Sequence, residues 1–190
     1  MSKRVTTVIC ASAVRFLCLV LLSGLIAATP VFAQGSHPGP SQARHQQPDS
    51  ATLVQKVRAA TRAFLDVSNV PDGYGPFLGC VSGPDHGAMG VHYVNGTLVG
   101  DGKIEVSTPE ALIYENSKLV GVEYIVDAAT WLANNNNTPP VLEGQSFQLV
   151  GIPNRYNIPA PFFELHVWAW RHNPNGAFVD WNDHVSCEGQ

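Results

Sequence analysis

The stretch LVGVEYIV, residues 119–126, decides the fold. Side chains of a strand alternate between the two faces of its sheet, and here both faces are apolar except at Glu123. A strand that is apolar on both faces is typical of the middle of a sheet. Upstream, the segment ALIYE (residues 111–115) is followed by the turn residues Asn116-Ser117-Lys118. We therefore predict a hairpin of strands 111–115 and 119–126, the second of them central.

Further strands are expected on either side of this hairpin. Residues 89–94 are strand-like and are followed by Asn95-Gly96, the strongest short hairpin signal. This pattern predicts that 89–94 pairs with a strand at 97–99. Two more strands are expected at 146–150 and 162–171.

Two helices are expected around the sheet. Apolar residues recur at helical spacing after a cap at Asp49 or Ser50, and Asp127 begins a short capped helix over 127–132. Residues 71–84 are rich in glycine and proline and predict long loops. The expected fold class is α+β, with a mainly antiparallel sheet of about five strands, one N-terminal amphipathic helix and long Gly/Pro-rich loops. The apolar positions of the N-terminal helix are Leu53, Val57, Ala60 and Phe64.

The N-terminus has the pattern of a secretory signal peptide. The basic residues Lys3, Arg4 and Arg15 precede an apolar run at 16–26, and a small-residue cleavage site ends at Ala33. Residues 34–50 are polar and rich in Gly, Ser, Pro and Gln, which predicts a disordered tether. We therefore expect a signal peptide at 1–33, a tether at 34–50 and a single globular domain at 51–190.

Composition excludes two classes of protein. The chain is 45% hydrophobic and 14% charged with a net charge of −4, which fits neither a disordered acidic tail nor a nucleic-acid-binding protein. Cleavage after Ala33 removes three of the 11 basic residues and none of the 15 acidic ones, so the mature chain would carry −7. After cleavage no apolar stretch is long enough to span a bilayer. A periplasmic or secreted location is expected.

Cysteine positions agree with export. Of the four cysteines, Cys10 and Cys18 lie in the signal peptide, so only Cys80 and Cys187 remain in the mature chain. In an oxidising compartment such a pair most simply forms a disulfide, although a cysteine nucleophile or metal ligand is the alternative. We predict a structural Cys80–Cys187 bridge.

Three polar residues stand inside otherwise apolar strands: His92, Glu123 and His166. Burial of an imidazole or a carboxylate is costly unless the group is hydrogen-bonded, paired or coordinated. Two histidines and one carboxylate are the ligands of a mononuclear Zn, Cu or Fe site with open positions. Glu164 shares the strand face of His166, so we expect it to orient that imidazole rather than bind metal itself.

Other interpretations of the same residues remain open. Glu123 could form an ion pair with Arg171 or Arg155 while both histidines hydrogen-bond within the core, which would make the protein purely structural. The same residues could also carry out acid–base catalysis without metal. His86, in a loop, is a weaker candidate ligand.

Tryptophans suggest a metal-free alternative. Trp168 and Trp170 lie two positions apart in the predicted strand 162–171, and Trp181 follows. Such rings could form a platform on which a carbohydrate or other flat small ligand stacks. Ordinary packing of a sheet face is the competing explanation.

Most of the mature chain resembles a family of exported bacterial proteins of unknown function. The resemblance rests on GCVSGP (79–84), GAMGVHYVN (87–95), PEALIYE (109–115), LVGVEYIV (119–126) and the segment from Leu165 to Cys187, with its LHVWAW and NPNG motifs. It implies export, a single domain and bacterial origin. It implies no substrate.

Overall fold

The structure is a computed structural model that describes residues 50–83, 85–135 and 137–190. The predicted signal peptide (1–33) lies outside these residues. So does the predicted tether (34–50), except that its last residue, Ser50, begins the helix α1 (Ser50–Thr61). Among the described residues no helix is long and apolar enough to cross a membrane.

The predicted central hairpin is confirmed. Strand β3 (Ala111–Glu115) pairs antiparallel with β4 (Lys118–Asp127). The turn between them places Asn116 and Ser117 at φ of 46° and 67°, a left-handed conformation that short polar residues tolerate better than most. On its other side β4 pairs with β8 (Phe162–Val167), so the strand is central as its two apolar faces predict.

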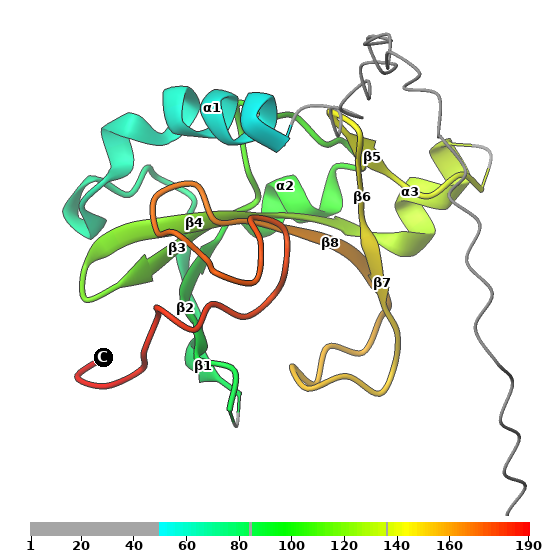
Figure 1. Ribbon diagram of the computed structural model, residues 1–190. Coiled ribbons are helices and arrows are strands. Elements are labelled where there is room, and N and C mark those ends of the chain that lie inside the picture. Colours follow the sequence, from blue (N-terminus) through cyan, green and yellow to red (C-terminus); the bar gives the residue numbers. More distant parts are fainter. Residues whose placement is uncertain (1–49, 84, 136) are drawn as a thin grey trace, which may run out of the picture. The chain divides into compact units, whose positions relative to one another are not determined.

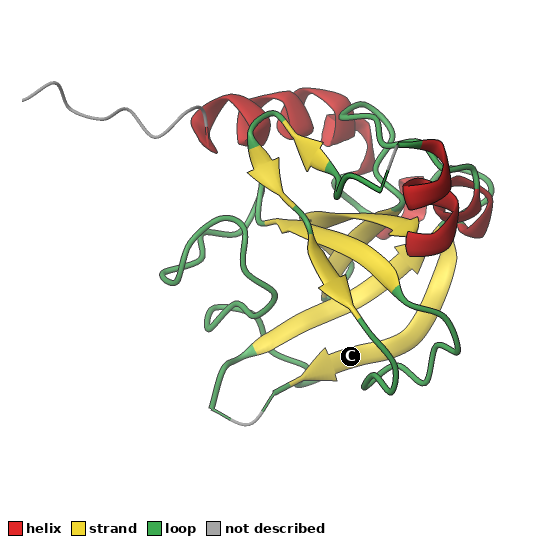
Figure 2. Ribbon diagram, turned by 90° about the vertical axis from the view of Figure 1, so that its right-hand side faces the viewer, coloured by secondary structure: helices red, strands yellow, loops and turns green. Residues whose placement is uncertain are grey.

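The main sheet has six strands rather than about five. Their order is β1-β2-β3-β4-β8-β7, every neighbouring pair is antiparallel, and the sheet curls into a half-barrel (Figure 2). The α+β class with a mainly antiparallel sheet is therefore confirmed. The strands not yet given are β1 (Gly75–Ser82), β2 (Ala88–Val94), β7 (Gln148–Val150) and the separate pair β5 (Val141–Leu142) and β6 (Gln145–Ser146).

The predicted hairpin at Asn95-Gly96 is wrong. The Asn95 side chain accepts hydrogen bonds from the backbone N–H groups of Thr97 and Leu98, so it caps a short helix, α2 (Gly96–Gly100). The strand that pairs with β2 is instead β1, from the glycine- and proline-rich stretch predicted as loop. A bulge between Phe77 and Cys80 breaks the alternation of β1, which hides it from a periodicity search.

The last two predicted strands also differ from the structure. The segment 146–150 is divided between β6 and β7, with the buried Phe147 between them. Strand β8 ends at Val167 rather than at residue 171, because the backbone N–H groups of Trp170 and Arg171 both donate to the carbonyl oxygen of Val120. Trp168 and Trp170 therefore lie beyond the end of β8, and the alternation of side chains in a strand does not apply to them.

The predicted helices are present with shifted ends. Helix α1 continues into the short 3-10 turns η1 (Arg62–Phe64) and η2 (Val67–Asn69). Asp127 caps α3 (Ala128–Asn134) by accepting from the N–H of Thr130. The other predicted cap position, Asp49, lies outside the described residues.

Strand alternation gives the sheet two different faces. One face carries Tyr124, Leu165 and their neighbours, and it packs against Leu53 and Val57 of α1, which lies across it (Figure 1). The alternate positions of the same strands, including Glu123 and His166, belong to the opposite face. The candidate site residues therefore lie on the face that α1 does not cover.

The C-terminal segment is fixed near β1 and β2. Cys80 and Cys187 form the predicted disulfide, with Cα atoms 5.5 Å apart. Asn182 forms an antiparallel bridge with Ala88 at the start of β2. Residues after β8 are thus held against the strand that carries His92.

Candidate metal centre

His92, Glu123 and His166 meet on one face of the sheet, each from a different strand. They lie on β2, β4 and β8, and Glu123 is the direct register partner of His166. Their exposed fractions are 7%, 5% and 2%. The structure therefore brings together in the interior the three residues that the sequence proposes as ligands.

The distances between their polar atoms suit a metal ion. His92 Nε2 lies 3.4 Å from His166 Nε2 and 3.4 Å from Glu123 Oε2. One ligand atom from each residue lies within 4.8 Å of the other two. A tetrahedral zinc ion with bonds of about 2.0–2.1 Å holds neighbouring ligand atoms about 3.3–3.4 Å apart. The three side chains can thus hold an ion with small side-chain adjustments.

Both imidazoles are neutral at neutral pH. Burial, with a smaller contribution from the neighbouring His166, lowers the pKa of His92 to about 3. Burial likewise lowers the pKa of His166 to about 3, with a smaller contribution from Arg155. A neutral imidazole keeps the nitrogen lone pair that binds a metal ion.

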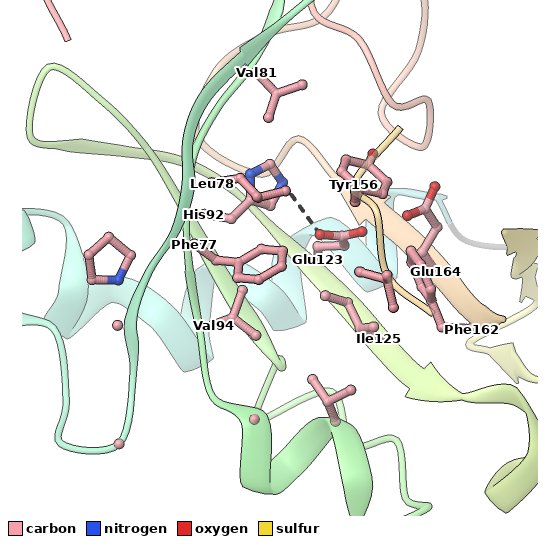
Figure 3. A pocket seen from close by; sticks show the side chains of 16 residues that line it. Phe77, Leu78, Val81, His92, Val94, Glu123, Ile125, Tyr156, Phe162 and Glu164 are labelled. Carbon is pink, nitrogen blue, oxygen red and sulfur yellow. Dashed lines mark ion pairs between the residues drawn. The ribbon is translucent and has the colours of Figure 1, made fainter. Parts of the chain in front are cut away.

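The surroundings of Glu123 favour its protonated form in the metal-free protein. Burial raises its pKa well above the ordinary 4.5, and the carboxyl groups of Glu164 and Asp180 contribute to the same shift. The contact between His92 and Glu123, drawn as a dashed line in Figure 3, therefore lies in surroundings that disfavour the charged form of both groups. A bound cation would reverse this balance by favouring the carboxylate.

A second group of polar side chains surrounds His166. The Gln148 side-chain amide donates to Glu164 Oε1 and to Asp180 Oδ1, both at 2.5 Å. Asp180 Oδ1 also lies 3.7 Å from His166 Nδ1, and Arg155 lies 4.0 Å from the other oxygen of Asp180. Glu164 belongs to this group as the shared strand face predicts, with a carboxylate oxygen within 4.8 Å of a His166 ring nitrogen. Asp180 and Gln148 were not expected here, because a loop residue and a strand amide give no spacing signal.

Two atoms of the cluster lack a hydrogen-bond partner among the described residues: His166 Nδ1 and Glu164 Oε2. Most buried polar atoms in folded proteins have such a partner, and leaving one without it is costly. The cluster is therefore incomplete as a purely structural network.

The ion pair considered for Glu123 does not form. Arg171 pairs with Glu115, and Arg155 is near Asp180. Within the described part of the chain, the ion-pair-range contacts of Glu123 are with the two histidines. The arginine interpretation of its burial is wrong.

The three tryptophans do not form one surface. Trp168 is 3% exposed, stacks on His166 and donates from Nε1 to the carbonyl oxygen of Val179. Trp170 donates instead to Thr61 of α1, and Trp181 lies under the guanidinium of Arg155. His86, the weaker candidate ligand, is exposed and belongs to neither metal-compatible cluster of the described residues.

A cavity of about 650 Å³ opens beside the candidate ligands. His92, Glu123 and Glu164 contribute to its wall, and most of the rest is apolar (Figure 3). A molecule in this cavity would have direct access to the metal site. Among the apolar lining residues are Phe77, Leu78, Val81, Val94, Ile125 and Phe162.

Comparison of the chain with family models, curated proteins and solved structures finds no match. The resemblance to exported bacterial proteins therefore stays a prediction. The arguments for a function come from the site itself.

Proposed function

We propose that the protein is an exported metal-binding protein with a mononuclear site formed by His92, Glu123 and His166. The ion is a divalent transition metal, Zn, Cu or Fe. The three residues supply two imidazole nitrogens and one carboxylate, a ligand set that leaves at least one coordination position open. That open position would face the cavity.

The observation that carries the proposal is the spacing of the three ligand atoms. Among the described residues two histidines and a carboxyl group with no arginine or lysine ion pair lie with their ligand atoms within 4.8 Å of one another, and two of the three separations, both from His92, are the 3.4 Å that a tetrahedral ion requires. His166 Nδ1, on the other side of the ring, lies 3.7 Å from Asp180 Oδ1, so binding of the ion at Nε2 would leave Nδ1 free to donate toward that carboxylate.

The surroundings support a bound cation on electrostatic grounds. Glu123, Glu164 and Asp180 place three carboxyl groups near the histidines, and the ion-pair-range contact of Arg155 among the described residues is with Asp180, at 4.0 Å. A divalent ion would offset the mutual repulsion that keeps the pKa of Glu123 raised. Asp180 would then orient the His166 ring from its far side, as carboxylates commonly do for metal-binding histidines.

Export is part of the proposal. The disulfide is compatible with an oxidising compartment, and the N-terminal pattern favours secretion. We propose a periplasmic or secreted location. The open coordination position would permit hydrolysis or another metal-assisted reaction, in which the ion would polarise a bound oxygen.

Elemental analysis tests the proposal. Mature protein prepared without a histidine tag should contain about one Zn, Cu or Fe per chain, or should bind one after dialysis against the metal. His92→Ala and His166→Ala should lose that ion. His86→Ala, at an exposed histidine outside the cluster, is the matched control and should keep it. Wild-type protein that binds no ion after reconstitution would contradict the proposal.

A further inference from the structure

The cavity beside the candidate ligands has the size and the apolar lining of a small-molecule site. Its volume of about 650 Å³ lies inside the range of about 300–1,000 Å³ typical of small-molecule sites. In the view of Figure 3, Phe77, Val94 and Ile125 gather next to His92 and Glu123. A ligand with an apolar body and one polar group would therefore complement the wall of the cavity.

No lysine or arginine belongs to the described lining of this cavity. The nearest cation, Arg155, lines an adjoining cavity that shares Leu78, Val81 and Tyr156 with the first. An anion in the apolar cavity would lose water without gaining a cationic side chain, which is unfavourable. The lining thus favours an uncharged occupant.

The mouth of the cavity is apolar as well. The bulge in β1 holds Leu78 at a φ of 62° with 55% of its surface exposed, and Phe77 beside it is also exposed. Both residues line the cavity. Exposed apolar side chains that gather at one place are typical of ligand-binding grooves and other contact sites.

We infer that this cavity binds an uncharged, largely apolar small molecule that carries a single hydroxyl or carbonyl oxygen. The apolar body packs against Phe77, Val94 and Ile125, and the oxygen lies beside His92 and Glu123. Binding of the apolar body depends on the cavity and does not require a metal ion. Placement of the oxygen at the open metal position rests on the proposed function.

Three probes with one nine-carbon chain and different head groups test the inference: nonan-1-ol, nonanoate and nonylammonium. Calorimetric titration uses the mature protein, once after chelator treatment and once after loading with zinc. In the chelator-treated form nonan-1-ol should bind at least tenfold more tightly than either charged probe, and zinc should tighten its binding further. Tighter binding of nonanoate, or of nonylammonium, to the chelator-treated form would overturn the uncharged class.

The two proposals fail separately in this experiment. Zinc binding without nonan-1-ol binding overturns the inference and leaves the metal site intact. Binding of nonan-1-ol to a protein that takes up no zinc overturns the metal site and the placement of the oxygen at the metal, and keeps the apolar ligand class.

Two glycines of α2 provide a matched pair of variants. A Cβ atom at Gly96 or Gly100 would meet no other atom within 4 Å, but only Gly96 lines the cavity. Gly96→Phe should weaken nonan-1-ol binding at least tenfold, whereas Gly100→Phe should leave it unchanged. Val94→Phe fills the same cavity from the strand β2 and should act like Gly96→Phe. Melting temperatures identify any variant that fails to fold. Unchanged binding in both folded cavity variants would overturn the inference.

Discussion

His92 Nε2 and His166 Nε2 lie 3.4 Å apart in the interior, although 74 residues separate them in the sequence. Antiparallel pairing of β2 with β3, β3 with β4 and β4 with β8 brings the two strands close enough for this contact. The strand pairing brings the two imidazoles together, and their ring nitrogens lie at hydrogen-bond distance. A metal ion would find its ligands already arranged.

Replacing either histidine should remove metal-induced stabilisation while leaving the fold intact. Wild-type protein at a free metal concentration of 100 times Kd should gain about 2.7 kcal/mol over the metal-free form. His92→Ala and His166→Ala should each lose nearly all of this gain, and the double variant should lose no more than either single variant. Chemical unfolding with and without chelator measures the gain. Additive losses would show two independent weak sites.

Glu123→Gln should have little effect on the metal-free protein and a large effect on the metal-loaded one. Burial raises the pKa of the carboxyl group and so favours its neutral form before metal binds, and the amide analogue should therefore change stability by no more than about 1 kcal/mol, the size of one neutral hydrogen bond. A buried pair with arginine would instead predict a loss of about 3–5 kcal/mol. With added metal, the melting temperature of the wild type should rise more than that of the variant. Equal rises would show that Glu123 is not a ligand.

Stability of the metal-free protein should reach its maximum between about pH 4.5 and 6.5. Because the folded-state pKa values of His92 and His166 are lowered to about 3, their contribution is complete above 6.5 and falls as the pH drops. Because the pKa values of Glu123, Glu164, Asp180 and Glu110 are raised, the last to about 8, their contribution is complete below their ordinary pKa values and falls as the pH rises. Within the window the histidine and carboxyl slopes, each about 1.4 kcal/mol per pH unit and proton, have opposite signs, so stability changes less steeply there than above pH 6.5.

Urea unfolding in chelator from pH 3 to 9 measures this profile. Glu123→Gln should reduce the decline above pH 6.5 and leave the acid side unchanged, because only a carboxyl titration is removed. Glu110 is not in the cluster of candidate ligands and accepts a hydrogen bond from the backbone N–H of Ile125, so most of its share of the alkaline decline should persist in that variant. A profile that rises steadily to pH 9 would contradict the raised carboxyl pKa values.

Loss of the Cys80–Cys187 bridge should destabilise the protein substantially. The bridge closes a loop with a sequence separation of 107, for which chain-entropy models give about 4–5 kcal/mol. Cys80→Ser, Cys187→Ser and the double variant should therefore lose similar amounts. Thiol titration of denatured, unreduced wild-type protein should find no free thiol in the mature chain. Two free thiols per chain would contradict the bridge.

The pattern of apolar residues was sufficient to predict a strand where both faces of that strand are packed. The hairpin of β3 and β4, and the inward direction of Glu123, follow from one apolar stretch with a single charged residue. The periodicity failed at β1, because its bulge adds Leu78 and Gly79, both at positive φ, and breaks the alternation. It failed again at Asn95, whose side chain can cap a helix as readily as it can begin a turn.

The candidate ligands could be predicted for a similar reason, but their partners could not. A histidine or glutamate in an apolar strand is conspicuous, so His92, Glu123 and His166 stand out in the sequence. Asp180 reaches His166 from the segment after β8, and only the tertiary fold brings that loop near the strand. The cavity is equally hidden, because its wall combines β1, α2 and residues between β7 and β8.

Asp180→Asn should weaken metal binding without removing the site. Asp180 Oδ1 lies 3.7 Å from His166 Nδ1, so a bound metal on the other nitrogen would leave Nδ1 to donate toward the carboxylate. Loss of such an orienting carboxylate typically costs about 10–100-fold in metal affinity. We expect a loss of that size with the stoichiometry kept at one. Asp183→Asn is the matched control, because Asp183 is exposed and hydrogen-bonds to Asn175.

The visible spectrum of cobalt-substituted protein separates positioning from ligation, because the spectrum depends on the ligand atoms themselves. An unchanged spectrum with weaker binding would fit an orienting role, whereas an altered spectrum would make Asp180 a ligand and overturn the three-residue site.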